Sequence, residues 1–179
     1  GHTTFRVAAM DRLDRVATPA EVSKMRGMAH EALASGAIGV STGLYYEPAR
    51  AATTEEVIEV CRPLSARQAL YCTHMRDEGP GVLDSIRESA EIGERARLPV
   101  VISHHKCAGR PNWGRSVETL ALIDTMRRKQ ALDIDVYPYI ASSTVLSPDR
   151  ARAAARVVVT WSKPHPEFSG RELGEVAAA

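Results

Sequence analysis

Hydrophobic segments recur along the chain at a nearly constant interval, and each one ends in polar side chains. Their centres near Val40, Cys72, Ile102 and Ile134 are 30 to 32 positions apart. The stretches between them have the caps and apolar spacing of helices. Strands that alternate with helices at this period predict a parallel sheet with right-handed crossovers. The predicted strands are 38–44, 70–73, 100–102 and 132–137.

Helix boundaries are indicated by caps, prolines and glycines. Thr18 and Glu21 form a capping box around Pro19, which predicts a helix over 19–35 that Gly36 ends. Similar signals predict helices from 54, from about 82 to 97, and over 116–129. Pro63 is expected to kink or shorten the helix that starts at 54. Pro48 is expected to keep 45–48 out of regular structure.

Four strand-and-helix units make half of a (β/α)8 barrel, which needs about 250 residues. We therefore predict an α/β protein, a partial (β/α)8 TIM barrel. The chain starts at Gly1 without an initiator Met, in what resembles a loop or strand. We expect residues 1–179 to be the central portion of a catalytic barrel domain, with no internal boundary and with the outer parts elsewhere. Beyond Ser147 the pattern weakens, and it predicts a short strand over 156–161 and a helix from Arg171.

Composition narrows the function classes. The chain is 44% hydrophobic and 25% charged, as in globular proteins, and its net charge of +1 gives no field that attracts nucleic acid or an anionic membrane. No apolar stretch reaches the roughly 20 residues that span a bilayer. Cys61, Cys72 and Cys107 form no C-x-x-C pair, which favours a reducing, cytoplasmic location.

Two polar runs at strand ends carry the candidate chemistry. They are Thr73–Glu78 (THMRDE) and Ser103–Lys106 (SHHK), and His74 and His104 are 30 positions apart. Both imidazoles are expected at the same rim of the sheet, where such folds keep their active sites. Imidazole is a common zinc ligand, although a histidine at a strand end can also hydrogen-bond a loop. His105 is expected to pack behind the rim, because successive side chains alternate between the two faces of a strand.

Further rim residues have two interpretations each. Lys106 is expected on the His104 side, where its ammonium either binds a substrate carboxylate or is a solvated strand end. Tyr137 is expected on the face of Asp135, as a hydroxyl donor or as a tyrosine that borders the core. The same two possibilities hold for three residues of other rim loops: Tyr46, Arg76 and Ser143.

Six runs, taken in order, resemble the N-acyl-D-amino-acid deacylase, or D-aminoacylase, family of the amidohydrolase superfamily. The resemblance covers essentially all 179 positions. The runs are Gly1–Thr4 (GHTT), Ser41–Leu44 (STGL), Thr73–Glu78 (THMRDE), Ser103–Lys106 (SHHK), Asp135–Tyr139 (DVYPY) and Trp161–Pro166 (WSKPHP).

The resemblance implies a zinc-bearing barrel with a small β-domain, and hydrolysis of a small-molecule N-acyl-D-amino acid to a D-amino acid and a carboxylate. It implies zinc binding by His74 and His104, and binding of the substrate carboxylate by Lys106 and Tyr137. The other matched positions are in the pocket (Tyr46 and Ser143) or support the rim (Arg76, Asp77 and Glu78). The family's His-x-His pair, its metal-binding Cys and its catalytic Asp match no position here, so none of the three cysteines is assigned to metal.

Other activities predict other features. A hydantoinase or dihydroorotase-like enzyme for cyclic amides usually bridges two metals with a carboxylated lysine, and no strand end here has an obvious lysine for that role. A non-catalytic α/β binding module predicts a phosphate loop, and the chain contains neither G-x-G-x-x-G nor G-x-x-x-x-G-K. Half a barrel has unpaired strand edges, so the isolated piece is expected to be poorly soluble and inactive. The sequence does not specify an oligomeric state.

Overall fold

The computed structural model describes residues 1–67 and 69–178, which divide into two compact units. The first unit contains residues 1–107 and 114–138, and the second contains 108–113 and the chain from 139 onward. The sequence predicts no boundary near 138. The structure has one there because the hydrophobic core ends early: Leu132 is the last buried hydrophobic residue of the described chain. No helix of the described residues has the length and apolar character needed to cross a membrane.

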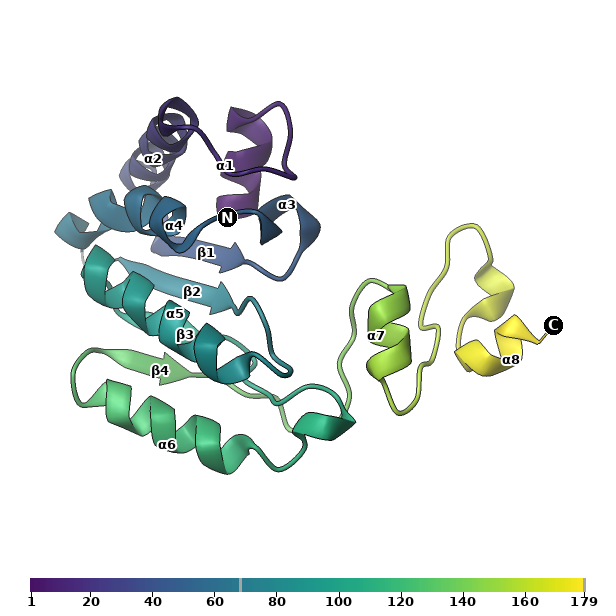
Figure 1. Ribbon diagram of the computed structural model, residues 1–179. Coiled ribbons are helices and arrows are strands. Elements are labelled where there is room, and N and C mark those ends of the chain that lie inside the picture. The colour runs from purple at the N-terminus through teal and green to yellow at the C-terminus, as the bar shows by residue number, and fades with distance from the viewer. Residues whose placement is uncertain (68, 179) are drawn as a thin grey trace. The chain divides into compact units, whose positions relative to one another are not determined.

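Four parallel strands form the centre of the first unit (Figure 1). Each strand pairs with the next one along the chain, in the order β1-β2-β3-β4. The strands are β1 (Gly39–Gly43), β2 (Leu70–His74), β3 (Val100–Ile102) and β4 (Leu132–Ile134). The parallel order confirms the predicted fold class, although β4 ends three residues before its predicted end.

Helices connect these strands and pack on one another in sequence. Those of the first unit are α1 (His2–Ala9), α2 (Pro19–Ala34), α3 (Glu47–Arg50), α4 (Thr54–Cys61), α5 (Val82–Ala96) and α6 (Ser116–Arg127). The predicted capping box is present at α2, where the Glu21 amide donates to Thr18 Oγ1 and the Thr18 amide donates to Glu21 Oε2. As Pro63 predicts, α4 ends at Cys61 and continues as the 3-10 turn η1 (Arg62–Arg67).

The two faces of the sheet differ in burial. One row across the strands is at most 4% exposed, and it consists of Val40, Tyr71, Val100 and Leu132. The neighbouring row points to the opposite face and is exposed or half-buried, and it consists of Ser41, Cys72, Val101 and Asp133. Because α5 and α6 contact β3 and β4, the buried row belongs to the helix-covered face. The second face is the one that lines the interior when such a sheet closes into a barrel.

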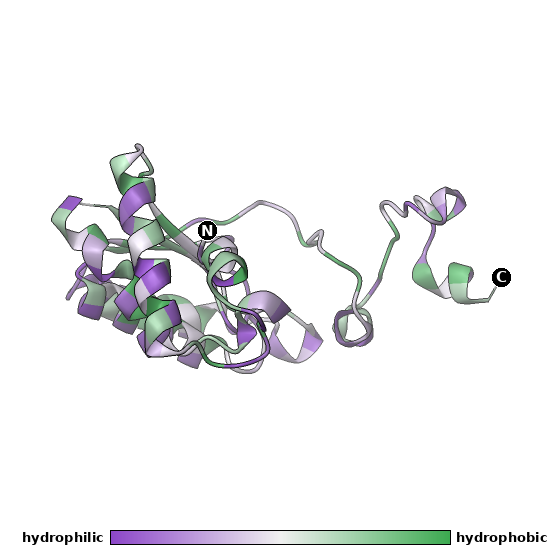
Figure 2. Ribbon diagram, turned by 90° about the horizontal axis from the view of Figure 1, so that it is seen from above, coloured by the Kyte–Doolittle hydropathy of each residue, from purple (hydrophilic) through white to green (hydrophobic). Residues whose placement is uncertain are grey.

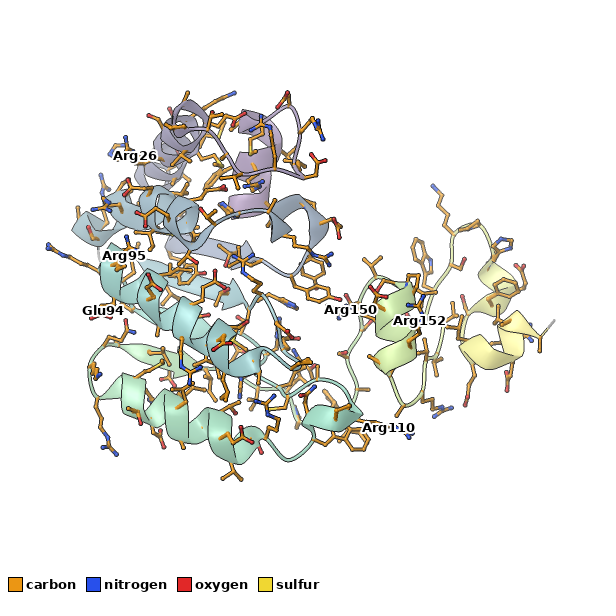
Figure 3. All side chains as sticks on the ribbon, in the orientation of Figure 1. Arg26, Glu94, Arg95, Arg110, Arg150 and Arg152 are labelled. Atoms are coloured by element: carbon orange, nitrogen blue, oxygen red, sulfur yellow. The ribbon has the colours of Figure 1, made fainter. Side chains whose placement is uncertain are left out.

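Close packing of α5 on β3 buries one face of that helix. Ile86, Ala90 and Gly93 are all buried. A Cβ atom at Gly93 would lie 2.1 Å from Val100 Cγ2, so only glycine allows this approach. The helices that flank the sheet carry both hydrophobic and hydrophilic residues (Figure 2), and side chains such as Arg26 of α2 and Arg95 of α5 point away from the sheet (Figure 3).

Two predictions about local structure in the first unit were wrong. Gly1 starts no loop or strand, because the helix α1 begins at His2 and buries His2 and Arg6. Pro48 does not keep its segment irregular, because it occupies the first turn of the helix α3, where a missing N–H costs nothing. In α6, Ile123 is buried, whereas Val117 and Leu120 are 78% and 44% exposed.

The second unit contains short elements. They are the helices α7 (Pro148–Ala153) and α8 (Leu173–Ala177) and the 3-10 turns η2 (Arg110–Asn112) and η3 (Pro166–Phe168). The predicted strand over 156–161 was wrong, because this segment makes only one isolated antiparallel bridge, between Val158 and Glu172. The predicted helix from Arg171 begins at Leu173, and its expected last residue, 179, lies outside the described residues.

Candidate metal centre

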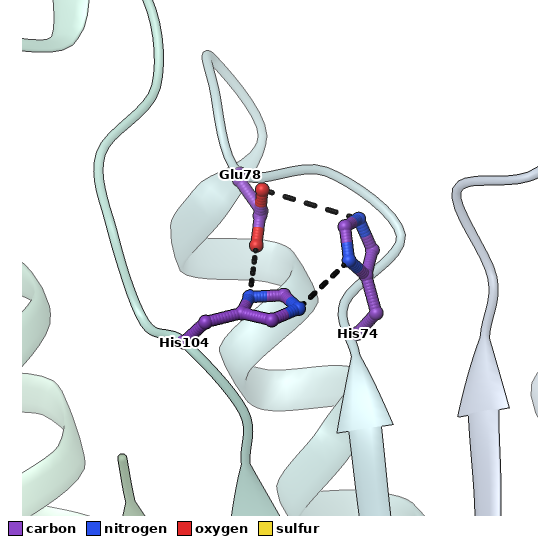
Figure 4. Close-up of side chains that lie close together, drawn as sticks. All are labelled: His74, Glu78 and His104. Carbon is purple, nitrogen blue, oxygen red and sulfur yellow. Dashed lines mark hydrogen bonds and ion pairs between the residues drawn. The ribbon is translucent and has the colours of Figure 1, made fainter. Parts of the chain in front are cut away.

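Two histidines converge at the carboxyl ends of neighbouring strands. His74 is the last residue of β2, and His104 follows β3 by two positions. The Ser103 amide donates to the Thr73 carbonyl, so the strand pairing continues up to the rim. His74 Nδ1 and His104 Nε2 are 3.0 Å apart, and the rings are nearly perpendicular (Figure 4). The predicted convergence of the two imidazoles is therefore present.

A strained backbone turn directs the His104 ring. Its φ of 43° lies in the left-handed region, which costs an ordinary residue about 1–2 kcal/mol. Asp135, just beyond β4, stabilises this turn: its Oδ1 accepts from the His104 amide at 2.6 Å, and its carbonyl accepts from the His105 amide at 2.8 Å. The next side chain is turned into the helix layer, where His105 Nε2 lies 2.9 Å from Thr119 Oγ1 of α6. Burial lowers the pKa of His105, which packs behind the rim as predicted.

Glu78 joins the two histidines from the loop after β2. Its side chain is only 8% exposed, and its Oε1 lies 3.0 Å from His104 Nδ1. Its Oε2 lies 3.9 Å from His74 Nε2. Asp77 shapes this loop by accepting hydrogen bonds from the amides of Gly79 and Gly81. The sequence analysis treated Glu78 only as a supporting residue, although its position four residues after His74 was a usable signal.

Lys106 lies beside this cluster, on the His104 side as expected. Its Nζ donates to Glu78 Oε1 at 2.6 Å and lies 2.9 Å from His104 Nδ1. The ammonium is also 5.5 Å from the centre of the Tyr137 ring, within the range of a cation–π contact. The structure thus brings Lys106 and Tyr137 together at the rim.

The remaining predicted residues have different positions. The Tyr46 ring is 4.9 Å from the His74 ring, so Tyr46 borders the cluster. Arg76 instead forms an ion pair with Glu88 at 2.8 Å, and Glu88 raises the pKa of the guanidinium. Arg76 also donates to the Arg50 and Ala52 carbonyls, so it fastens the loop. Ser143 is exposed and belongs to the second unit.

The donor set suits a divalent metal ion. Ligand atoms of His74, Glu78 and His104 lie within 4.8 Å of one another. Tetrahedral zinc with Zn–N distances of about 2.0–2.1 Å places two nitrogens roughly 3.3 Å apart, close to the 3.0 Å between the two rings. The cysteines do not join this set: Cys72 Sγ lies 2.9 Å from Ser103 Oγ, and burial raises the pKa of Cys61 to about 12.

Comparison with known proteins shows extensive similarity in sequence. No family model matches the chain. It is 56% identical over 178 residues to a D-aminoacylase of Alcaligenes xylosoxydans xylosoxydans, and the matched segment covers 99% of this chain and 37% of the relative. It is 50% identical over 179 residues to an N-acyl-D-aspartate deacylase of the same organism, which covers 99% of this chain and 36% of the relative. The chain thus spans little more than a third of these relatives.

Solved structures agree with the sequence relatives. A D-aminoacylase crystal structure, described as defining a novel subset of amidohydrolases, has a TM-score of 0.96 and 53% identity, covering 99% of this chain and 38% of that one. An N-acyl-D-glutamate deacylase from Bordetella bronchiseptica, solved with zinc and a phosphonate mimic of the tetrahedral intermediate, has a TM-score of 0.95 and 42% identity, with the same coverage. The chain is therefore a homologue of the D-aminoacylases, a group of amidohydrolases, over the part of their length that it spans.

Proposed function

We propose that this chain supplies the central part of the catalytic barrel of a zinc-dependent N-acyl-D-amino-acid deacylase. The reaction is hydrolysis of the amide bond to give a D-amino acid and a carboxylate. The observation that carries the proposal is the meeting of His74 and His104 at 3.0 Å, in a chain 56% identical to a D-aminoacylase. Because the relatives are longer, the activity belongs to a protein in which this segment is joined to the remaining barrel strands. The relatives favour this activity over cyclic-amide hydrolysis and over a binding module.

Zinc is the metal we propose for His74 and His104. Two imidazoles with a carboxylate nearby are typical of zinc sites, and the N-acyl-D-glutamate deacylase structure contains zinc. Zinc held there would polarise the acyl carbonyl and lower the pKa of water toward about 7. His74 and His104 bind and orient this centre, while the aspartate that moves the proton is expected in the part of the protein beyond this segment.

Lys106 and Tyr137 are proposed to hold the carboxylate of the substrate. The side chain of Lys106 is 23% exposed and its ammonium lies beside His104, so an anion bound to it would sit next to the metal-holding rings. With the carboxylate fixed at this point and the amide toward the histidines, the two enantiomers differ only in where the α-carbon places its side chain and its hydrogen. Selection of the D-configuration is therefore proposed to depend on which of these two positions the pocket leaves open to a side chain. Tyr46, whose ring lies 4.9 Å from that of His74, and Ser143 are proposed as further pocket residues.

The setting we propose is cytoplasmic, with a small-molecule substrate and no nucleic acid or membrane partner. The three cysteines are free thiols, as a reducing compartment favours. The net charge of +1 gives no strong attraction to a polyanion.

The proposed function is tested by assaying the intact protein with N-acetyl-D-amino acids and with their L-enantiomers. We expect hydrolysis of the D-series only, loss of activity after zinc is removed by a chelator, and recovery after zinc is added back. Metal analysis should find zinc in the purified protein. Equal hydrolysis of both enantiomers, or full activity in a protein that contains no metal, would contradict the proposal.

A further inference from the structure

We infer that Glu78 is a positioning residue that orients His74, His104 and Lys106 together. This inference rests on the proposed function, because it concerns the same metal centre. Sequence resemblance marks Glu78 only as a residue near the rim, whereas the structure places its carboxylate against all three side chains. No other acidic side chain of the described residues joins both histidines in this cluster.

The orientation of the rings supports a positioning role. His74 Nδ1 and His104 Nε2 face each other, so these are the two nitrogens available to one shared ion. The other nitrogen of each ring, Nε2 of His74 and Nδ1 of His104, faces Glu78 (Figure 4). A histidine that binds metal through one nitrogen carries its proton on the other and usually donates it to a carboxylate or carbonyl, which fixes the ring. Here Glu78 Oε1 lies at hydrogen-bond distance from His104 Nδ1, whereas Oε2 lies 3.9 Å from His74 Nε2, close enough for an ion pair but too far for a hydrogen bond.

Charge and burial point the same way. A carboxylate with 8% exposure needs charged or hydrogen-bonding partners, and the Lys106 ammonium at 2.6 Å is such a partner. Lys106 Nζ also lies 2.9 Å from His104 Nδ1, so the lysine and the imidazole compete for the same carboxylate oxygen. Glu78 thereby links the residue proposed to hold the substrate carboxylate with the residues proposed to hold zinc.

The competing role for Glu78 is that of a third metal ligand. Its oxygens lie nearest the other nitrogen of each ring, with Oε1 at 3.0 Å from His104 Nδ1 and Oε2 at 3.9 Å from His74 Nε2. Both roles require the loop that carries Glu78 to stay in place, and only the loss of a ligand would change the coordination shell of the ion. The Asp77 hydrogen bonds to Gly79 and Gly81, together with the hydrogen bond that the Asp77 amide donates to Ser85 Oγ, hold that loop in place.

The test is Glu78→Gln in the intact protein, with Co²⁺ in place of zinc so that the visible spectrum reports the coordination shell. Loss of a residue that orients metal ligands typically weakens metal affinity by about 10–100-fold. We expect a loss of that size, a cobalt spectrum that keeps its band positions and intensity at saturating metal, and a changed KM because Lys106 loses its partner. An unchanged metal affinity, or a spectrum that reports a lost ligand, would overturn the inference.

Glu59→Gln is the matched control. Glu59 is also a partly buried carboxylate paired to cations, Arg26 and Arg62, but it contacts neither histidine. It should leave metal affinity unchanged. If Glu78→Gln does not fold, Glu78→Asp keeps the charge, shortens the reach and is expected to weaken metal affinity in the same direction. A parent protein that binds no metal would contradict the proposed function itself. A Glu78→Gln variant that binds metal as tightly as the parent would contradict only the role of Glu78.

Discussion

Two clusters in the first unit use the same chemical groups for different purposes. One joins His2 and Arg6 of α1 to Glu56 of α4. The other is the rim cluster, defined as His74, Glu78, His104 and Lys106. Each combines imidazole, carboxylate and a basic side chain. Their difference in burial and in hydrogen bonding shows which of them is built for chemistry.

The first cluster is a buried structural network. Both carboxylate oxygens of Glu56 accept from Arg6 Nη1, Oε1 at 2.5 Å and Oε2 at 2.7 Å, and Oε1 also lies 3.0 Å from His2 Nε2. Arg6 also donates to three backbone carbonyls: those of Leu13, Arg15 and Pro48. The side chains of His2, Arg6 and Glu56 are at most 1% exposed. The network therefore fastens α1 and the loop after it to α4.

The rim cluster is arranged otherwise. Its side chains are 8% to 31% exposed, and it lies where the strands end. Its two imidazoles direct nitrogen toward nitrogen, a contact in which only one partner can donate a proton. A shared cation satisfies both nitrogens at once. Residue types alone therefore do not distinguish the two clusters, but their burial and the contact between two ring nitrogens at the rim do.

Removal of one buried charge should have the largest effect on stability. Glu56→Gln leaves the Arg6 guanidinium buried without its counter-ion, which typically costs about 3–5 kcal/mol. We expect the free energy of unfolding to fall by about that amount in urea denaturation of the intact protein, with the metal sites still able to bind zinc. Glu59→Gln, on the same helix but with a 29% exposed side chain, is the control and should change stability by less than about 1 kcal/mol. Similar losses for both variants would remove the contrast between buried and exposed pairs.

Removal of the rim ammonium should weaken substrate binding and also lower stability. Lys106→Met keeps the apolar stem but removes the charged hydrogen bond to the substrate carboxylate, worth about 1.5–3 kcal/mol. We expect KM for an N-acyl-D-amino acid to rise by about 10–100-fold, and the unfolding free energy to fall as well, because the nearly buried Glu78 carboxylate loses its ammonium partner. Steady-state kinetics and urea denaturation of the same preparation separate the two effects. A KM equal to that of the parent would remove Lys106 from the substrate site.

Sequence reasoning found the part of the site that follows from strand periodicity. His74 and His104 are placed by the regular repeat of strand and helix, and Lys106 and Tyr137 by alternation along a strand. The position of Glu78 depends on a loop shaped by Asp77, which no periodicity encodes. Local pattern equally gives no sign that His2 packs on Glu56, because 54 positions separate the two residues. Contacts of that kind come from tertiary packing, as does the left-handed turn at His104 that Asp135 holds.

The pH dependence of stability gives the smallest test of the comparison. Burial disfavours the ionised form of Glu56, but the hydrogen bonds and charges of His2 and Arg6 outweigh it, so the pKa of Glu56 lies below its ordinary value of 4.5. The unfolded chain then takes up this proton first as the pH falls. The stabilisation by the ionised carboxylate is complete above about pH 4.5 and is lost progressively below it. We expect the unfolding free energy of the parent to decline more steeply on acidification than that of Glu56→Gln, measured by denaturation at a series of pH values below 5. Parallel curves for the two proteins would mean that the buried network does not depend on the charge of Glu56.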